Sequence, residues 1–151
     1  MNIFNADFTD FINCLNHNNV EYILVGGYAV IIRGYSRSTG DLDIWVNKTK
    51  ENFIRLQKAL KAFGLPSEAV EEEKFFSDEF DVFTIGRPPA AIEIMTAVKG
   101  VGFSEAFNTS TLENLDEVVV RVIHINQLFQ AKRAAGRHKD LNDLENLPLP
   151  E

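Results

Sequence analysis

The first half of the chain alternates between helical and strand-like patterns of apolar residues. Residues 7–18 place apolar side chains at positions i, i+3, i+4 and i+7, which predicts an amphipathic helix. The apolar run at residues 22–25 has the length of one buried strand, and residues 41–46 predict a second strand. Residues 50–63 carry another helical stripe, which the Gly64-Leu65-Pro66 stop ends.

The second half begins with strands and ends with helices. Two strands are expected at 81–85 and 91–95, joined by a turn of Gly and Pro, and the valine-rich stretch 117–123 predicts another. Residues 126–135, with Asn126 as the expected N-cap, and residues 140–147 predict two short helices. We therefore expect an α/β (α+β) fold with a mixed sheet flanked by helices. It should form a single domain over residues 1–151, closed by a helical pair at about 125–147.

The stretch from Gly26 to Val46 carries the first candidate chemistry. Gly26 and Gly27 directly follow the strand at 22–25, and a short apolar run up to Gly34 predicts a helix after them. Glycine has no Cβ, so the backbone can approach a ligand closely at this point. The free N–H groups and the positive dipole end of the following helix would suit a phosphate.

Two carboxylates open the next strand. Asp41 and Asp43 are two residues apart, so their side chains should point to the same face, with Cα atoms roughly 6.6 Å apart. Two carboxylates on one face repel unless a positive charge lies between them, and Mg²⁺ is a hard cation that carboxylates bind. The alternative is structural, with Asp41 capping a turn and Asp43 on a solvated strand face.

This stretch resembles the signature of the DNA polymerase β-like nucleotidyltransferase superfamily. The matching residues are Gly26-Gly27, Arg37-X-Thr39 and Asp41-Leu42-Asp43-Ile44. They look most like the small prokaryotic branch that includes the abortive-infection (AbiEii-like) toxins and minimal nucleotidyltransferases. The closest polymerase-like enzymes have Gly-Ser at the glycine pair, and the serine touches the triphosphate. Gly27 has no hydroxyl, so backbone N–H groups would serve instead.

The resemblance implies an activity and a third carboxylate. The activity is transfer of a nucleoside monophosphate from a nucleoside triphosphate to an acceptor hydroxyl, with two Mg²⁺ (or Mn²⁺) ions. The third carboxylate of the family, usually Asp, comes from a strand next to the Asp-X-Asp strand. Glu93 matches it and points away from the face that Ile92 and Ile94 bury. The implied catalytic and metal-binding residues are Asp41, Asp43 and Glu93, and the implied phosphate-side residues are Gly26, Gly27 and Arg37.

A second resemblance covers the basic stretch at 132–144. Small nucleotidyltransferases of this branch often end with a similar Lys…Gly-Arg-X-Lys-Asp-X-X-Asp-Leu pattern. Lys132, Arg137 and Lys139 could then reach a triphosphate, because cationic clamps stabilise phosphoryl chemistry. In the alternative, Asp140 and Asp143 pair with these cations and hold two helices together. The residues alone favour neither interpretation.

Composition limits the partners and the compartment. The formal net charge of −7 argues against a broad nucleic-acid platform. The single cysteine, Cys14, rules out an internal disulfide and suits a reducing cytoplasm. No signal peptide or membrane span is expected. The acidic stretch at 68–81 is expected to be a solvated helix and loop, or else a surface for a basic partner.

Three functions from different classes remain open at this stage. The first is a metal-dependent nucleotidyltransferase, with a protein, a small molecule or an RNA end as acceptor. The second is a catalytically silent nucleotide-binding module. The third is a protein-interaction component of a toxin–antitoxin pair. Retention of Asp41, Asp43 and Glu93 favours the enzyme.

Overall fold

The computed structural model describes residues 3–87 and 89–150. Its helices are α1 (Ala6–His17), α2 (Gly26–Ile32), α3 (Lys50–Phe63), α4 (Glu72–Phe76), α5 (Phe103–Thr109), α6 (Ile125–Ala135) and α7 (His138–Asn146), with a 3-10 turn, η1 (Ser67–Val70). Its strands are β1 (Tyr22–Val25), β2 (Leu42–Val46), β3 (Val82–Ile85), β4 (Ile92–Met95), β5 (Thr111–Asn114) and β6 (Val119–Val122).

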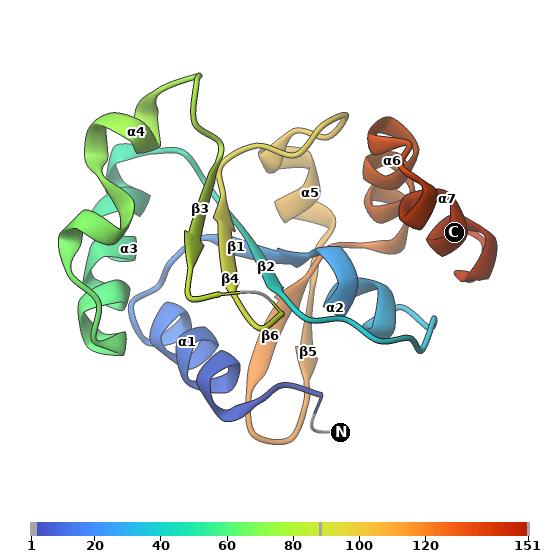
Figure 1. Ribbon diagram of the computed structural model, residues 1–151, viewed down its shortest axis with the longest axis horizontal. Coiled ribbons are helices and arrows are strands. Elements are labelled where there is room, and N and C mark those ends of the chain that lie inside the picture. Colours follow the sequence, from blue (N-terminus) through green and yellow to red (C-terminus); the bar gives the residue numbers. More distant parts are fainter. Residues whose placement is uncertain (1–2, 88, 151) are drawn as a thin grey trace.

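The strands form one mixed sheet in the order β3-β4-β2-β1-β6-β5. β2 runs antiparallel to β1 and parallel to β4, and β1 runs parallel to β6. Both edge strands, β3 and β5, pair antiparallel with their single neighbours. Figure 1 shows α1, α3 and α4 to one side of this sheet and α5, α6 and α7 to the other. The expected mixed sheet flanked by helices is confirmed.

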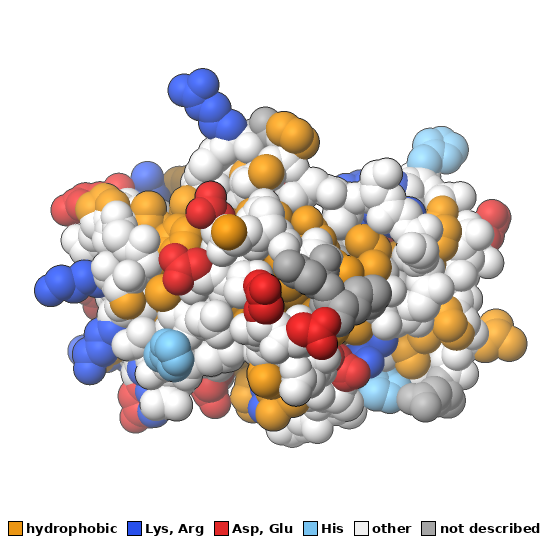
Figure 2. Space-filling model, turned by 90° about the horizontal axis from the view of Figure 1, so that it is seen from below, with side chains coloured by type: hydrophobic (Ala, Val, Ile, Leu, Met, Phe, Trp, Pro, Cys, Tyr) orange, Lys and Arg blue, Asp and Glu red, His pale blue; other side chains and the backbone are white. Residues whose placement is uncertain are grey.

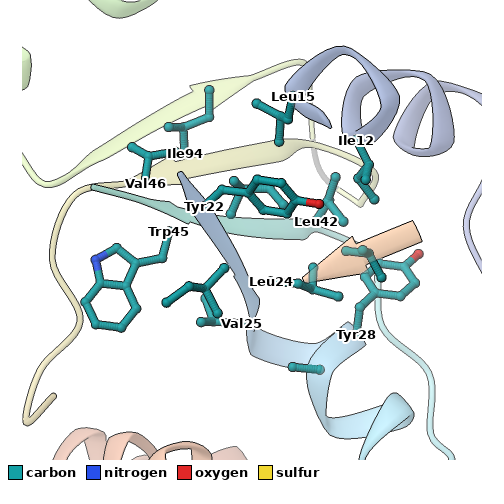
Figure 3. Close-up of a cluster of buried hydrophobic side chains, with 14 of the residues drawn as sticks. Ile12, Leu15, Tyr22, Leu24, Val25, Tyr28, Leu42, Trp45, Val46 and Ile94 are labelled. Atoms are coloured by element: carbon teal, nitrogen blue, oxygen red, sulfur yellow. The ribbon is translucent and has the colours of Figure 1, made fainter. Parts of the chain in front are cut away.

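The side chains of β2 alternate between the two faces of the sheet, which contact different helices. Leu42, Ile44 and Val46 alternate with Asp43 and Trp45, and period-2 alternation sends the two sets to opposite faces. Trp45 packs edge-on against Phe103 of α5, at 5.2 Å between ring centroids. Figure 3 shows Trp45 on the opposite side of the sheet from Ile12 and Leu15 of α1. Asp43 therefore shares the α5 side of the sheet with Trp45.

Capping residues fix the ends of α3 where the sequence predicts them. The Thr49 side chain accepts a hydrogen bond from the backbone N–H of Asn52, which satisfies one donor of the first turn. Gly64 adopts the left-handed conformation (φ 103°) at the C-terminal end, a conformation that glycine reaches at little cost. The α3 helix thus begins and ends at the predicted residues.

The start of α6 differs from the expectation. The helix begins at Ile125, and His124 is its N-cap, with Nδ1 accepting from the backbone N–H of Asn126 at 3.1 Å. The prediction of Asn126 as N-cap is wrong, because an imidazole nitrogen takes the place of the usual short oxygen side chain. Similarly, α7 begins at His138, two residues before the expected start.

The sequence did not predict α5 and β5. The α5 helix fully buries only Ala106, and β5 is a largely exposed edge strand paired with β6 alone. Neither segment has a strong hydrophobic period of its own, so only contact with the rest of the chain specifies it. The acidic stretch is mostly exposed, as expected, with Phe75 of α4 and Val70 of η1 as buried anchors.

Within the described residues, no helix combines the length and the apolar character that a membrane crossing requires.

Candidate functional site

The turn from β1 into α2 places glycine directly against a candidate carboxylate. Val25, the last residue of β1, lies opposite Asp43 of β2 in the antiparallel register. Gly26 follows with a φ of 72°, a conformation that other residues rarely adopt. A Cβ at Gly26 would overlap the carboxylate of Asp43. The first glycine of the pair is therefore required both by backbone conformation and by the close approach of Asp43.

The second glycine makes room for the loop before β2. A Cβ at Gly27 would overlap the Thr39 hydroxyl and lie 3.4 Å from a guanidinium nitrogen of Arg37. Thr39 and Arg37 belong to the Arg37-X-Thr39 motif. The absence of a side chain at Gly27 thus lets this motif pack against the start of α2.

Strand register brings the three carboxylates to one face of the sheet. Asp43 on β2 is paired directly with Glu93 on β4, so both side chains point the same way. Glu93 accepts a hydrogen bond from the Thr84 hydroxyl of β3 at 2.9 Å. Asp41 lies just before β2, and its Oδ1 accepts from the backbone N–H of Ala91 at 2.9 Å. The sequence distance of about 50 residues is closed by the parallel β2–β4 pair.

These carboxylates interact electrostatically. Burial, followed by the negative charges of Glu93 and Asp41, raises the pKa of Asp43 to about 6. Lys139 and Lys132 act in the opposite direction and lower the same pKa. Asp43 is therefore a carboxyl group held close to like charges, with two cations near enough to offset part of the repulsion.

All of the predicted site residues line one cleft of about 470 Å³. They are Gly26, Gly27, Arg37, Asp41, Asp43, Glu93, Lys132, Arg137 and Lys139. The carboxylates come from the segment just before β2, from β2 and from β4. Lys132 lies on α6, Arg137 in the turn after it and Lys139 on α7. The cleft thus has a carboxylate wall on the sheet and a cationic wall on the C-terminal helices.

Most of the cations are held by two buried aspartates of α7. Lys132, which is buried, lies 3.2 Å from Asp140 and 3.2 Å from Asp143. Arg137 contacts Asp140 at 2.7 Å, and Arg37 makes two hydrogen bonds to Asp143, at 2.8 and 3.0 Å. The sequence left open whether the basic stretch binds phosphate or pairs with Asp140 and Asp143. The structure shows the ion pairs for Lys132 and Arg137.

The ion pairs of this network lower the pKa of Asp140. Burial by itself raises the pKa of its carboxyl group, but hydrogen bonds from Arg137 and Lys132 outweigh burial, and the pKa lies below its usual value. Lys139 differs from the other cations, because among residues 3–87 and 89–150 no carboxylate lies within ion-pair distance of it. Lys139 is exposed and lines the cleft, so its ammonium group is available to a ligand.

The carboxylate oxygens of Asp41, Asp43 and Glu93 suit a hard cation, although the three side chains do not converge on one point. Within the described part of the chain, no three His, Cys, Asp or Glu side chains converge closely enough to hold a metal ion. Asp41 accepts a hydrogen bond from the backbone N–H of Ala91, and Glu93 accepts one from the Thr84 hydroxyl. Three carboxylates on one face, with Asp43 destabilised in its charged form, fit Mg²⁺ or Mn²⁺ in chemistry.

Comparison with known proteins bears on the fold. The chain superposes on a crystal structure of a candidate nucleotidyltransferase from Thermotoga maritima with a TM-score of 0.62. The match covers 91% of this chain and 88% of that one, at 15% sequence identity. The two chains share one fold. No family model matches the sequence, and no curated protein matches it. The likeness extends to the fold and does not assign the chain to the abortive-infection branch.

Sequence reasoning missed several residues of the cleft. Val82 of β3 and Met95 of β4, which pair with each other, line the cleft. Thr84 of β3 pairs with Glu93 and donates a hydrogen bond to its carboxylate. Both strands were expected from the sequence, but the six residues between Ile85 and Ile92 leave their register open, so the sequence did not show that Thr84 faces Glu93. The pairing of Arg37 with Asp143, 106 residues away, had no signal in the sequence.

Proposed function

We propose that this protein is a metal-dependent nucleotidyltransferase. It would transfer a nucleoside monophosphate from a nucleoside triphosphate to the hydroxyl group of an acceptor. One observation carries the proposal: three carboxylates and a set of cations line a single cleft together with Gly26 and Gly27. The shared fold with a candidate nucleotidyltransferase supports it.

The cationic wall would bind the triphosphate. Lys139 would contribute a free ammonium group, and phosphate oxygens would draw Arg137 toward the cleft from its exposed position. Arg37 lines the same cleft while its guanidinium is held by two hydrogen bonds to Asp143, so it would present a fixed positive charge. Gly26 and Gly27 line the same cleft, and their backbone N–H groups would serve the phosphates at the end of β1. The space that a Cβ would fill at these two positions is taken by Asp43 and Thr39.

The carboxylate wall would hold the cation and order the acceptor. Asp41, Asp43 and Glu93 would hold Mg²⁺ or Mn²⁺, which supplies activation of the attacking oxygen and neutralisation of the pyrophosphate leaving group when bound. Asp43 would have to lose its proton on binding, because its raised pKa of about 6 leaves it partly protonated in mildly acidic solution. Thr84 would orient Glu93 through its 2.9 Å hydrogen bond.

The experiment that tests the proposal has a transfer readout and a binding readout. Purified protein is incubated with Mg²⁺, a cell lysate and each α-labelled nucleoside triphosphate in turn, and labelled products are identified. Nucleotide binding in Mg²⁺ is measured separately by calorimetry. We expect one triphosphate to label a discrete product, and Asp43→Asn to abolish both labelling and the Mg²⁺ dependence of binding.

Asp81→Asn is the matched control, because Asp81 is exposed and does not line the cleft. Equal labelling by wild type and by an Asp41→Asn, Asp43→Asn double variant would overturn the proposal. Nucleotide binding that depends on both carboxylates, with no labelled product from any triphosphate, would instead identify a catalytically silent binding module.

A further inference from the structure

A groove with an apolar floor runs between α3 and the segment that follows it. It consists of two hollows, of about 540 and 390 Å³, which share Phe53, Gln57 and Ser67 in their linings. Figure 1 places α3 and α4 at one end of the molecule and α6 and α7 at the other. The groove therefore lies away from the cationic wall of the cleft, and an occupant of the groove would leave that wall open.

The first hollow is apolar with a basic border. Phe53, Ile54 and Leu65 line it, and Ile54 is 49% exposed although it is a large aliphatic side chain. Lys58 and Lys61 follow Ile54 at i+4 and i+7, so the three side chains form one stripe along α3. Ile54 thus leaves apolar area in water beside a hollow whose other large apolar side chains, Phe53 and Leu65, are buried and half-buried.

The second hollow has an acidic border. Glu68, Glu71 and Glu72 line it, on η1 and at the start of α4. Among the described residues, Lys58, Lys61 and Glu72 have no ion-pair partner, and Glu71 has only Lys74, at 3.8 Å. Figure 2 shows hydrophobic side chains lying among basic and acidic ones toward the end of the molecule where α3 and α4 lie. Charges of opposite sign, most of them without an ion-pair partner in the described part of the chain, thus border the two hollows of one groove.

We propose that this groove is the interface of a homodimer with two-fold symmetry. A two-fold axis through the shared floor would bring the Lys58–Lys61 border of one copy against the Glu68–Glu72 border of the other, and the reverse contact would form at the same time. In this arrangement the exposed Ile54 of each copy would lie over the second hollow of its partner, where Phe53 and Val70 supply apolar lining.

Charge complementarity favours a second copy over other occupants. A uniformly basic partner would be repelled by Lys58 and Lys61, and a uniformly acidic partner by the glutamates. A second copy supplies both signs in the required order. The net charge of −7 opposes association in general, so the proposal requires these local pairs to outweigh the long-range repulsion.

The first test measures oligomeric state by sedimentation and light scattering over a range of protein concentrations. We expect the wild-type chain to dimerise, and Lys58→Glu/Lys61→Glu, Glu68→Lys/Glu72→Lys and Ile54→Asp each to weaken the dimer by about tenfold or more. Arg55→Glu is the matched control, since Arg55 is an exposed cation of α3 that lines neither hollow. Circular dichroism melts confirm that each variant is folded.

The second test mixes the two charge-reversed variants in equal amounts. In a two-fold dimer both contacts of the mixed pair join opposite charges, so dimerisation should return, whereas each variant alone should stay monomeric. A monomeric wild type at about 100 μM would overturn the proposal. A dimer that these variants leave intact would also overturn it, as would variants whose mixture stays monomeric. Transfer of label is not needed for any of these outcomes.

Discussion

At the scale of single residues, the negative charge of Asp43 has two opposite effects: the proposed function needs it, and the fold is destabilised by it. Its carboxylate lies against Gly26 and beside Glu93 and Asp41, and its pKa is raised to about 6 by burial and by those charges. An ionised Asp43 therefore destabilises the metal-free protein. Such a cost at a cleft is typical of a group kept for chemistry rather than for stability.

We predict that Asp43→Asn stabilises the metal-free protein. In EDTA at pH 7.5, removing the charge should raise the free energy of unfolding by about 2–3 kcal/mol and the Tm by about 5 °C. Because the folded-state pKa lies above the unfolded value, wild type should lose this stability as pH rises from about 4 to about 6 and should match the variant at lower pH. Thermal unfolding at several pH values measures both effects.

Asp81→Asn, at an exposed position, should leave the unfolding curve unchanged and serves as control. A loss of stability for Asp43→Asn in EDTA would mean that its carboxylate has a structural partner, and the interpretation of the cleft as a metal site would then fail.

At the scale of elements, the junction between β1 and α2 decides the geometry of the cleft. The strand ends at Val25 opposite Asp43, and the chain turns into α2 through Gly26 in the left-handed region. A side chain at this position would meet both an unfavourable backbone conformation and the carboxylate of Asp43. A second glycine of the chain, Gly64, has a similar backbone conformation with open space around it, which separates the two effects.

We predict that Gly26→Ala destabilises the protein by more than Gly64→Ala. Alanine in the left-handed region costs roughly 1–2 kcal/mol, and this should be the whole cost at Gly64. At Gly26 the overlap with Asp43 adds to it, so the loss should exceed the Gly64 value by at least about 1 kcal/mol. Urea unfolding of the two variants measures the difference. Equal losses of stability would show that the Asp43 side chain moves aside freely, and that its contact with Gly26 does not contribute to stability.

At the scale of the whole molecule, an ion-pair network joins segments that are far apart in the chain. Arg37 precedes β2, Lys132 lies on α6, and both reach Asp143 of α7. Asp143 and Asp140 are almost completely buried, so their charges depend on these partners. Breaking one member of a buried pair leaves an uncompensated charge, which is strongly destabilising. The network thereby fixes the C-terminal helices over the cleft.

A double-mutant cycle of Arg37→Gln and Asp143→Asn should show strong coupling. We expect Asp143→Asn alone to cost about 3 kcal/mol, since it also deprives buried Lys132 of a partner, and the coupling energy to be about 1–3 kcal/mol. The matched control is the cycle of Lys48→Gln and Asp78→Asn. That surface pair is 3.4 Å apart with Asp78 fully exposed, so its coupling should stay below about 0.5 kcal/mol. Additive effects at Arg37 and Asp143 would contradict the network.

The sequence by itself determined the elements that have a hydrophobic period or a clear boundary signal. The α3 helix has an apolar stripe, a Thr49 cap and a Gly64 stop, and its predicted bounds match. Glu93 was selected through the family resemblance, whereas spacing and strand alternation alone select the Gly26-Gly27 pair, Asp41 and Asp43 as candidate site residues. These signals are local, since they depend on residues within a few positions of one another.

The tertiary structure decided what depends on distant partners. The α5 helix and β5 have weak patterns of their own and form because Phe103 packs on Trp45 and because β5 pairs with β6. The composition of the basic stretch was clear, but only packing of α7 against α6 and the Arg37 loop showed that Asp140 and Asp143 hold its cations. Burial is the physical reason: a carboxylate pairs with whichever cation is enclosed with it, and enclosure is a property of the folded chain.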